Sequence, residues 1–110
     1  MADDAEIIWA PSADHDRGRI YEHLRLRNTE AAVRTVARIM EAVDSLETHP
    51  LLAAIAEDVP PRGRCRQRIV RPFRVAYAVD GARVYVLRIW DSRRDPKELR
   101  VPETPDDEVG

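Results

Sequence analysis

The residues best suited to chemistry are the arginines between positions 62 and 74, in the segment RGRCRQRIVRPFR, which holds six arginines and no carboxylate. Guanidinium groups offer paired donors in a planar fork that matches carboxylate and phosphate groups. Because Arg64, Arg66 and Arg68 have the same parity, an extended backbone presents them on one face. The segment therefore favours an anion clamp over the alternative, an edge strand that its charges protect against aggregation.

The charge of the whole chain, -2, hides an asymmetry along the sequence. All 18 Lys and Arg lie between Arg17 and Arg100, where they face 11 carboxylates and leave an excess of seven positive charges. The remaining Asp and Glu lie toward the two ends of the chain. A positive body of this kind suits a partner made of phosphates or of acidic side chains.

The length of 110 residues is that of one small domain. We expect this domain to span residues 1–100, followed at 101–110 by an acidic tail with too little apolar surface to fold. Cys65 has no internal disulfide partner, and no charged-then-apolar leader or long apolar run is present, so a cytoplasmic protein without membrane contact is expected. Cys65 is predicted to be an ordinary buried or half-buried thiol. The histidines and the cysteine lack metal-ligand spacing, and we expect neither a metal nor a cofactor.

The first half of the chain is predicted to form a strand followed by two helices. Residues 6–10 are apolar and extended, and Ser12 is placed to cap a helix over about residues 13–27. Asn28 and Thr29 break this helix and cap the next one, which should end near Thr48 because a proline follows soon after. Apolar residues of the second helix recur at steps of three and four, which places them on one stripe: Ala32, Val33, Val36, Ile39, Met40, Val43 and Leu46.

The second half is predicted to be a loop followed by three strands. Residues 51–65 form the loop, and Pro72 allows a tight turn between an extended segment at 66–70 and a strand that begins at Phe73. Asp80-Gly81 suits a type I′ turn that would pair Val79 with Ala82. The apolar parity defines a core face of Phe73, Val75, Tyr77 and Val79 against Val84 and Val86, with Arg74 on the other face.

These elements define an α+β domain, in which an N-terminal strand and a two-helix hairpin pack on a small antiparallel sheet. The order of five pieces, EIIWAPSA, LETHP, FRVAYAV, VYVLRIW and RRDPKEL, resembles the RelE/ParE toxins of bacterial type II toxin-antitoxin pairs over roughly residues 6 to 99. The resemblance implies the same fold, with the first strand joined to the sheet. It also implies a cognate antitoxin that lays an extended or helical segment over the helical hairpin or the sheet edge.

The resemblance leaves two toxic mechanisms open. RelE-like members cut messenger RNA in the ribosome, whereas ParE-like members block DNA gyrase without cutting anything themselves. Cleavage through the 2′-hydroxyl needs a base, an acid and cations around the phosphate. The resemblance places Arg68, Arg71 and Arg74 at the family's basic sheet positions and Arg93 at the ribonucleases' tail arginine. Of these, Arg68, Arg74 and Arg93 would be catalytic only in a ribonuclease. Trp90-Asp91 stands where ribonucleases carry a tyrosine or histidine, and Asp91 is a doubtful base because arginine neighbours lower a carboxylate pKa.

We therefore favour, by a small margin, a growth-inhibiting toxin of the ParE-like kind, which acts through an arginine-rich sheet face. A ribosome-dependent mRNA endonuclease is the alternative, and a non-toxic homologue that only binds an antitoxin is the second. For Arg93, Arg94 and Asp95, the alternative to function is a solvated segment with a local salt bridge. Trp90 is predicted to pack against the core rim. The residues predicted to bind the target or a phosphate are Arg64, Arg66, Arg71 and Arg94.

Overall fold

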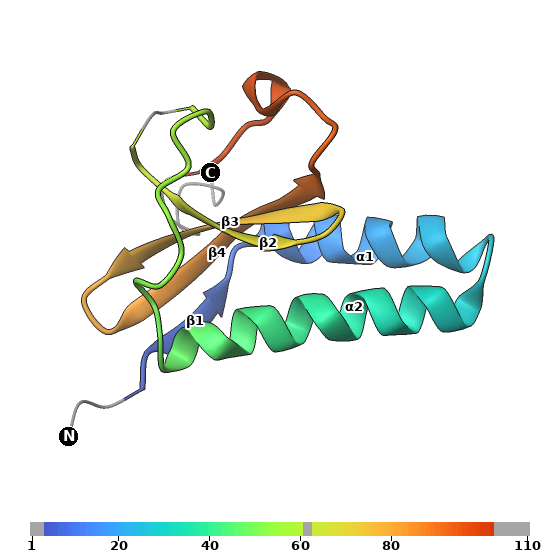
Figure 1. The fold of residues 1–110 in the computed structure, drawn as a ribbon, viewed down its shortest axis with the longest axis horizontal. Helices are drawn as coiled ribbons and strands as arrows, with labels where there is room; N and C mark the ends of the chain where they lie inside the picture. Colours follow the sequence, from blue (N-terminus) through green and yellow to red (C-terminus); the bar gives the residue numbers. More distant parts are fainter. Residues whose placement is uncertain (1–3, 61–62, 103–110) are drawn as a thin grey trace.

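A computed structural model describes residues 4–60 and 63–102 of the chain. The chain forms an α+β domain in which two long helices lie against a four-stranded sheet (Figure 1). This confirms the predicted fold class. In chain order the elements are β1 (Glu6–Trp9), α1 (Pro11–Arg25), α2 (Thr29–Asp44), the 3-10 turn η1 (Ser45–Glu47), β2 (Arg66–Val70), β3 (Phe73–Asp80), β4 (Arg83–Asp91) and the 3-10 turn η2 (Pro96–Glu98).

The sheet is mixed, with the strand order β1-β4-β3-β2. Strands β2, β3 and β4 form the predicted antiparallel meander, and the two-residue connection between β2 and β3 contains Pro72. The first strand joins the sheet as expected, and it runs parallel to β4, with Ile7 beside Val84. This parallel pairing is possible because the helical hairpin, the loop and two strands lie between β1 and β4 in sequence and give the chain room to cross over.

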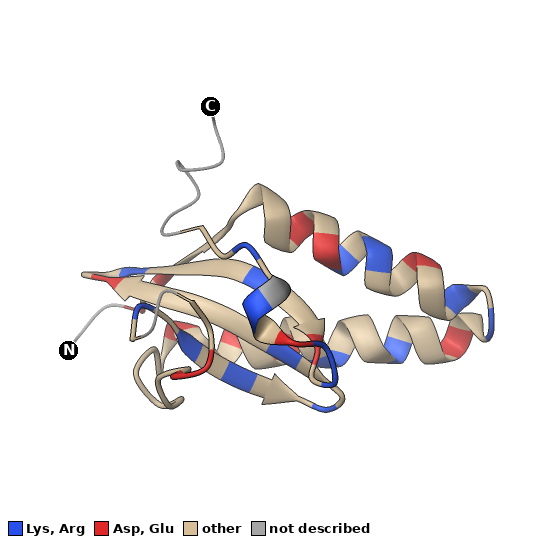
Figure 2. Ribbon diagram, turned by 90° about the horizontal axis from the view of Figure 1, so that it is seen from above, with Lys and Arg blue, Asp and Glu red and all other residues tan. Residues whose placement is uncertain are grey.

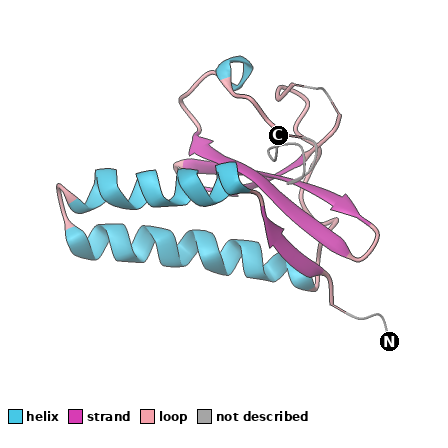
Figure 3. Cartoon of the chain, turned by 180° about the vertical axis from the view of Figure 1, so that it is seen from behind, coloured by secondary structure: helices cyan, strands magenta, loops and turns pink. Residues whose placement is uncertain are grey.

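The helical hairpin covers one face of the sheet, and its tip extends beyond the sheet (Figure 3). Ile39 and Val43 of α2 are fully buried and pack in one cluster with Val75 and Val86 of the sheet. The predicted stripe on this helix therefore faces the core. Val33 is the exception: it is 54% exposed because it lies near the tip, where no strand covers the helix.

The predicted cap of the first helix is wrong. Helix α1 begins at Pro11, its N-cap residue is Ala10, and it ends at Arg25. The Ser12 hydroxyl does not cap the helix but donates a hydrogen bond of 2.7 Å to the carbonyl of Leu87 in β4. Proline at the first helical position needs no backbone donor and has a helical φ, so the helix starts without a side-chain cap. The second cap agrees with the prediction, since the Asn28 side chain accepts from Ala31 N at 3.1 Å.

The turn between β3 and β4 is shifted by one residue from the predicted position. Val79 pairs with Val84, not with Ala82, and the only positive φ in this turn is that of Gly81, at 60°. A glycine at the first central position is typical of a type II′ turn, which does not need positive φ at the second position. From Tyr77 onward the partners move by two residues, which keeps side-chain parity, and a β-bulge between Ala76 and Tyr77 shifts the earlier pairs by one more residue. The predicted core face is buried except at Val79, which is partly buried.

The opposite face of the sheet is covered by loop residues within 51–60 and 63–65 and by the segment that follows β4. Ala56 and Val59 of the loop pack with Trp90 of β4 and with Leu99 in a second buried cluster. This cluster also contains Cys65, which is 4% exposed, so the predicted buried thiol is confirmed. Trp90 is predicted to pack at the core rim; its packing role is confirmed, but at 2% exposed it lies within the core cluster itself. Of the predicted tail, residues 103–110 lie outside the described residues.

No helix in the described part of the chain is both long enough and apolar enough to span a membrane.

Candidate functional site

The arginines of the segment 62–74 are distributed over both faces of the sheet. Directly paired residues of neighbouring strands point to the same face. Arg68 pairs with Val75, whose side chain lies in the core on the helical side, whereas Ile69 pairs with Arg74 on the opposite side. The structure therefore does not bring Arg68 and Arg74 together. Lys and Arg occupy strands, helices and loops alike, with Asp and Glu among them (Figure 2). Arg62 lies outside the described residues.

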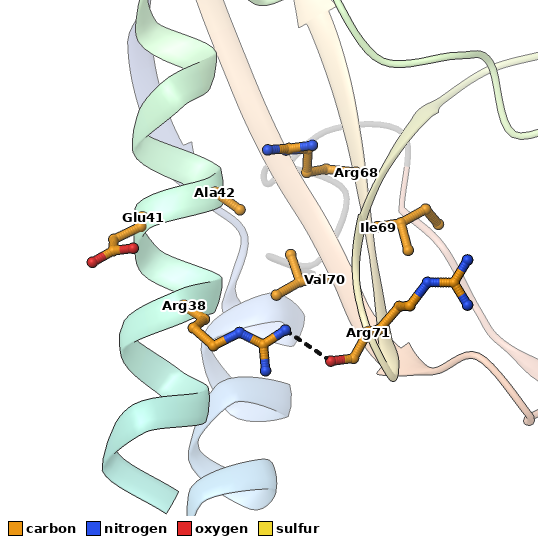
Figure 4. Close-up of a pocket in the computed structure, with 7 residues that line it drawn as sticks. All are labelled: Arg38, Glu41, Ala42, Arg68, Ile69, Val70 and Arg71. Atoms are coloured by element: carbon orange, nitrogen blue, oxygen red, sulfur yellow. Dashed lines mark hydrogen bonds between the residues drawn. The ribbon is translucent and has the colours of Figure 1, made fainter. Parts of the chain in front are cut away.

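On the helical side, Arg68 lines a shallow cleft of about 620 Å³ between β2 and α2 (Figure 4). Arg38 of α2 reaches across it, and its Nη2 donates to the carbonyl of Arg71 at 3.1 Å. The Arg71 side chain points away from the helix. Arg66, the other β2 arginine of this parity, donates from Nη1 to the Ala53 carbonyl at 2.7 Å. We refer to this region, lined by Arg38, Glu41, Ala42, Arg68, Ile69, Val70 and Arg71, as the β2–α2 cleft.

On the opposite face, Arg74 is held by three neighbours. Its Nε donates to Gln67 at 2.7 Å, and its two terminal nitrogens donate to the two carboxylate oxygens of Asp58 at 2.7 and 3.0 Å. Its guanidinium also stacks over the Trp90 ring, 5.0 Å from the centroid. The Arg74 side chain is 10% exposed and that of Asp58 is 57% exposed. The hydrogen bonds from Arg74 lower the pKa of Asp58, although some desolvation acts in the other direction.

At the end of β4, Arg93 folds back on Asp91. The guanidinium donates to both oxygens of the Asp91 carboxylate, from Nε at 2.9 Å and from Nη2 at 2.7 Å. The pKa of Asp91 falls to about 2, first because of this side-chain hydrogen bonding and then because the Arg93 backbone N–H also donates to the carboxylate. Asp91 is therefore fully ionised at neutral pH. The prediction of a salt bridge within Arg93, Arg94 and Asp95 named the wrong carboxylate: Arg93 pairs with Asp91, and Asp95 accepts from the Lys97 N–H.

The other predicted anion-binding residues are at the surface. Arg64 precedes β2 and is exposed, and Arg94 is exposed in the turn after β4, where its backbone N–H donates to the Asp91 carbonyl at 2.9 Å. Neither lines the β2–α2 cleft. Their predicted role in binding a target or a phosphate stays a prediction.

Sequence reasoning missed an ion pair between Asp16 of α1 and Arg88 of β4. Arg88 donates to Asp16 from Nε at 2.7 Å and from Nη2 at 3.1 Å, and the Ile89 N–H donates to the same carboxylate at 2.9 Å. Strand β1 pairs with β4 only as far as Val86, so Asp16 provides an acceptor along the edge that β1 leaves open. The sequence held a signal: Asp16 lies three residues after Ala13 and four before Ile20, so a helix places it on the same side as these apolar residues.

Among the described residues, no group of three or more His, Cys, Asp or Glu side chains is arranged to hold a metal ion. The single cysteine of the chain, Cys65, is buried. Burial raises the pKa of Cys65 to about 11, with Arg74 opposing and Asp58 reinforcing that shift.

Comparison with known proteins agrees with the predicted resemblance. The sequence profile of the ParE toxins of type II toxin-antitoxin systems, parDE, matches residues 7–96. Among solved structures, a chain of the chromosomal ParDE TA system from P. aeruginosa matches with a TM-score of 0.67 at 27% sequence identity, over 79% of this chain and 95% of that one. No curated protein sequence matches the chain. Since the family profile spans nearly all of the described domain and the fold agrees, the chain belongs to the ParE toxins of type II toxin-antitoxin systems.

Proposed function

We propose that this toxin inhibits bacterial growth by blocking DNA gyrase without catalysing a reaction, and that a cognate antitoxin holds it inactive. The proposal follows from the resemblance to the ParE-like toxins, which block gyrase. Because gyrase acts in the cytoplasm, we expect the toxin to act there as well. The excess of positive charge between Arg17 and Arg100 suits an antitoxin segment rich in carboxylates. The matched structure from P. aeruginosa is itself described as a ParDE toxin-antitoxin system, which supports an antitoxin partner here.

One observation carries the non-catalytic part of the proposal: the groups that a ribonuclease would need do not converge. Arg68 and Arg74 lie on opposite faces of the sheet, so they do not surround one phosphate. Asp91, the carboxylate at the strand end, has a pKa of about 2 and is a poor proton acceptor at neutral pH. Arg74 already donates to Asp58 and Gln67. Cleavage through a 2′-hydroxyl needs a base, an acid and cations around one phosphate, and this geometry disfavours that arrangement.

The experiment that tests the proposal is induction of the protein alone in a bacterial host, with message integrity and plasmid supercoiling followed from the moment growth slows. We expect intact messages, loss of negative supercoiling and an SOS response. Purified gyrase should also lose supercoiling activity when the purified protein is added. Ribosome-dependent cleavage of messages would refute the proposal and support the endonuclease alternative, and undisturbed growth would support a non-toxic homologue. Restored growth on co-expression of a ParD-type antitoxin tests the partner.

A pair of substitutions tests the role of the arginines in toxicity. We expect the double variant Arg68→Ala with Arg74→Ala to lose toxicity, since it removes one cation from each sheet face. The matched control, Arg34→Ala with Arg83→Ala, removes the same charge from side chains that are 68% and 59% exposed. Circular dichroism of each purified variant verifies folding. A folded Arg68/Arg74 variant with full toxicity would eliminate both arginines from the toxic surface.

A further inference from the structure

Two arginines from different elements line the β2–α2 cleft. Arg68 projects from β2 toward α2, and Arg38 projects from α2 toward β2 (Figure 4). Between them lie the small apolar side chains of Ala42 and Val70, which are 9% and 7% exposed. The cleft therefore has an apolar floor with a cation on either side. The only carboxylate among its lining residues is Glu41, whose side chain points away from both arginines.

Some hydrogen-bond donors of the arginines in this cleft have no acceptor in the described part of the chain. Nε of Arg68 is buried and donates to no acceptor there, and none of the ion pairs there involves Arg68. Arg38 uses Nη2 for the Arg71 carbonyl and forms no ion pair with a described carboxylate. This contrasts with Arg74 and Arg88, each of which has a carboxylate partner. A buried donor without an acceptor is unfavourable, so Arg68 gains a missing hydrogen bond if its side chain turns to present Nε to a ligand oxygen in the cleft.

We propose that the β2–α2 cleft is a binding site for a phosphate group, held between Arg38 and Arg68. A terminal phosphate carries close to two negative charges and three acceptor oxygens, enough to accept from guanidinium groups on two sides, whereas a carboxylate has two oxygens. The site needs the planar fork of arginine, because Nε of Arg68 is the donor that lacks a partner. This phosphate site is a property beyond the proposed inhibition of gyrase, and it does not depend on that proposal. The phosphate can be free or the terminal group of a small ester.

The test uses the purified full-length protein and inorganic phosphate as the probe, with sodium chloride at matched ionic strength as the reference. The Nε–Hε signals of arginine are followed by NMR during the titration. We expect the Arg68 and Arg38 signals to shift and saturate with phosphate and to stay in place with chloride. A parallel titration with a 5′-mononucleotide identifies the source: equal affinity assigns the site to free phosphate, and tighter binding assigns it to a phosphate ester.

Substitution by lysine separates the guanidinium fork from simple positive charge. Arg68→Lys should weaken phosphate binding by about tenfold or more, because a hydrogen bond to a charged group is lost while the charge remains. Arg38→Lys tests the other side of the cleft if Arg68→Lys does not fold. Arg34→Lys, one turn earlier on α2 and 68% exposed, is the matched control and should bind like the wild type. The proposal is overturned if the Arg68 signal does not move, or if both cleft variants bind phosphate as the wild type does.

Discussion

The ion pair between Asp16 and Arg88 gives the sharpest prediction about stability. The two side chains are 10% and 15% exposed, so removal of the carboxylate leaves a guanidinium in a largely buried position. Three hydrogen bonds are lost with Asp16, two from Arg88 and one from the Ile89 backbone. Breaking a buried pair from one side costs about 3–5 kcal/mol. We expect Asp16→Ala to lower the free energy of unfolding by about 3–5 kcal/mol, a large part of the ~5–15 kcal/mol that a domain usually has.

The assay is chemical denaturation followed by circular dichroism, with a thermal melt as a second measure. A loss of this size lowers Tm by about 12 °C or more in a domain of this length. Asp14→Ala is the matched control, because Asp14 lies on the same helix and pairs with Arg17 at the surface, where an ion pair contributes about 0–1 kcal/mol.

A double substitution tests the physical reason for the loss. If the cost comes from a buried charge without a partner, Arg88→Met added to Asp16→Ala should recover part of the stability, because the guanidinium is then absent. The Arg88 Nη1 bond to the Arg100 carbonyl, 2.8 Å long, is also lost, so the recovery is expected to be incomplete. The reasoning would be refuted if Asp16→Ala cost no more than Asp14→Ala, or if the double variant were less stable than Asp16→Ala alone.

Three further outcomes are expected. Cys65, with its pKa raised to about 11, should react with iodoacetamide at pH 8 at least about 100-fold more slowly in the folded than in the unfolded protein, because less thiolate forms and burial also shields the sulfur, as followed by mass spectrometry. Because Arg93 depresses the folded pKa of Asp91 from 3.8 to about 2, their pairing should stabilise the fold above pH 3.8 and stop doing so as the pH falls toward 2; the Tm difference between wild type and Arg93→Gln, measured across this range, should shrink accordingly. Tyr77→Phe should cost about 1 kcal/mol in urea denaturation, because the buried hydroxyl donates to the Pro50 carbonyl at 2.9 Å.

Much of the fold was predictable because it depends on local periodicity. The stripe on α2 and the apolar parity of β3 are properties of neighbouring residues, so the error in pairing β3 with β4 does not change which β3 side chains face the core. Proline at position 72 likewise acts on its own backbone, and the turn before β3 lies where the sequence predicted it.

The partners of polar side chains could not be predicted in this way, because they join residues that are far apart in sequence. The local pattern predicts Ser12 as a helix cap, yet the tertiary structure places the Leu87 carbonyl within reach of its hydroxyl. Asp58 and Arg74 are 16 residues apart, and the loop fold rather than either residue's neighbours brings them together. The parallel position of β1 beside β4 is another long-range choice that no local pattern specifies.

The arginines of the candidate site show which part of the geometry the sequence alone does not determine. By itself it determined that arginines are concentrated between residues 62 and 74 and that their neighbours alternate between two faces. It did not determine whether Arg68 and Arg74 share a face, because that depends on the register between β2 and β3. The tertiary structure pairs Arg68 with Val75, and a shift of one residue would have placed Arg68 directly beside Arg74. Register is set by packing and turn geometry across both strands, so only the folded sheet determines that the two arginines lie on opposite faces.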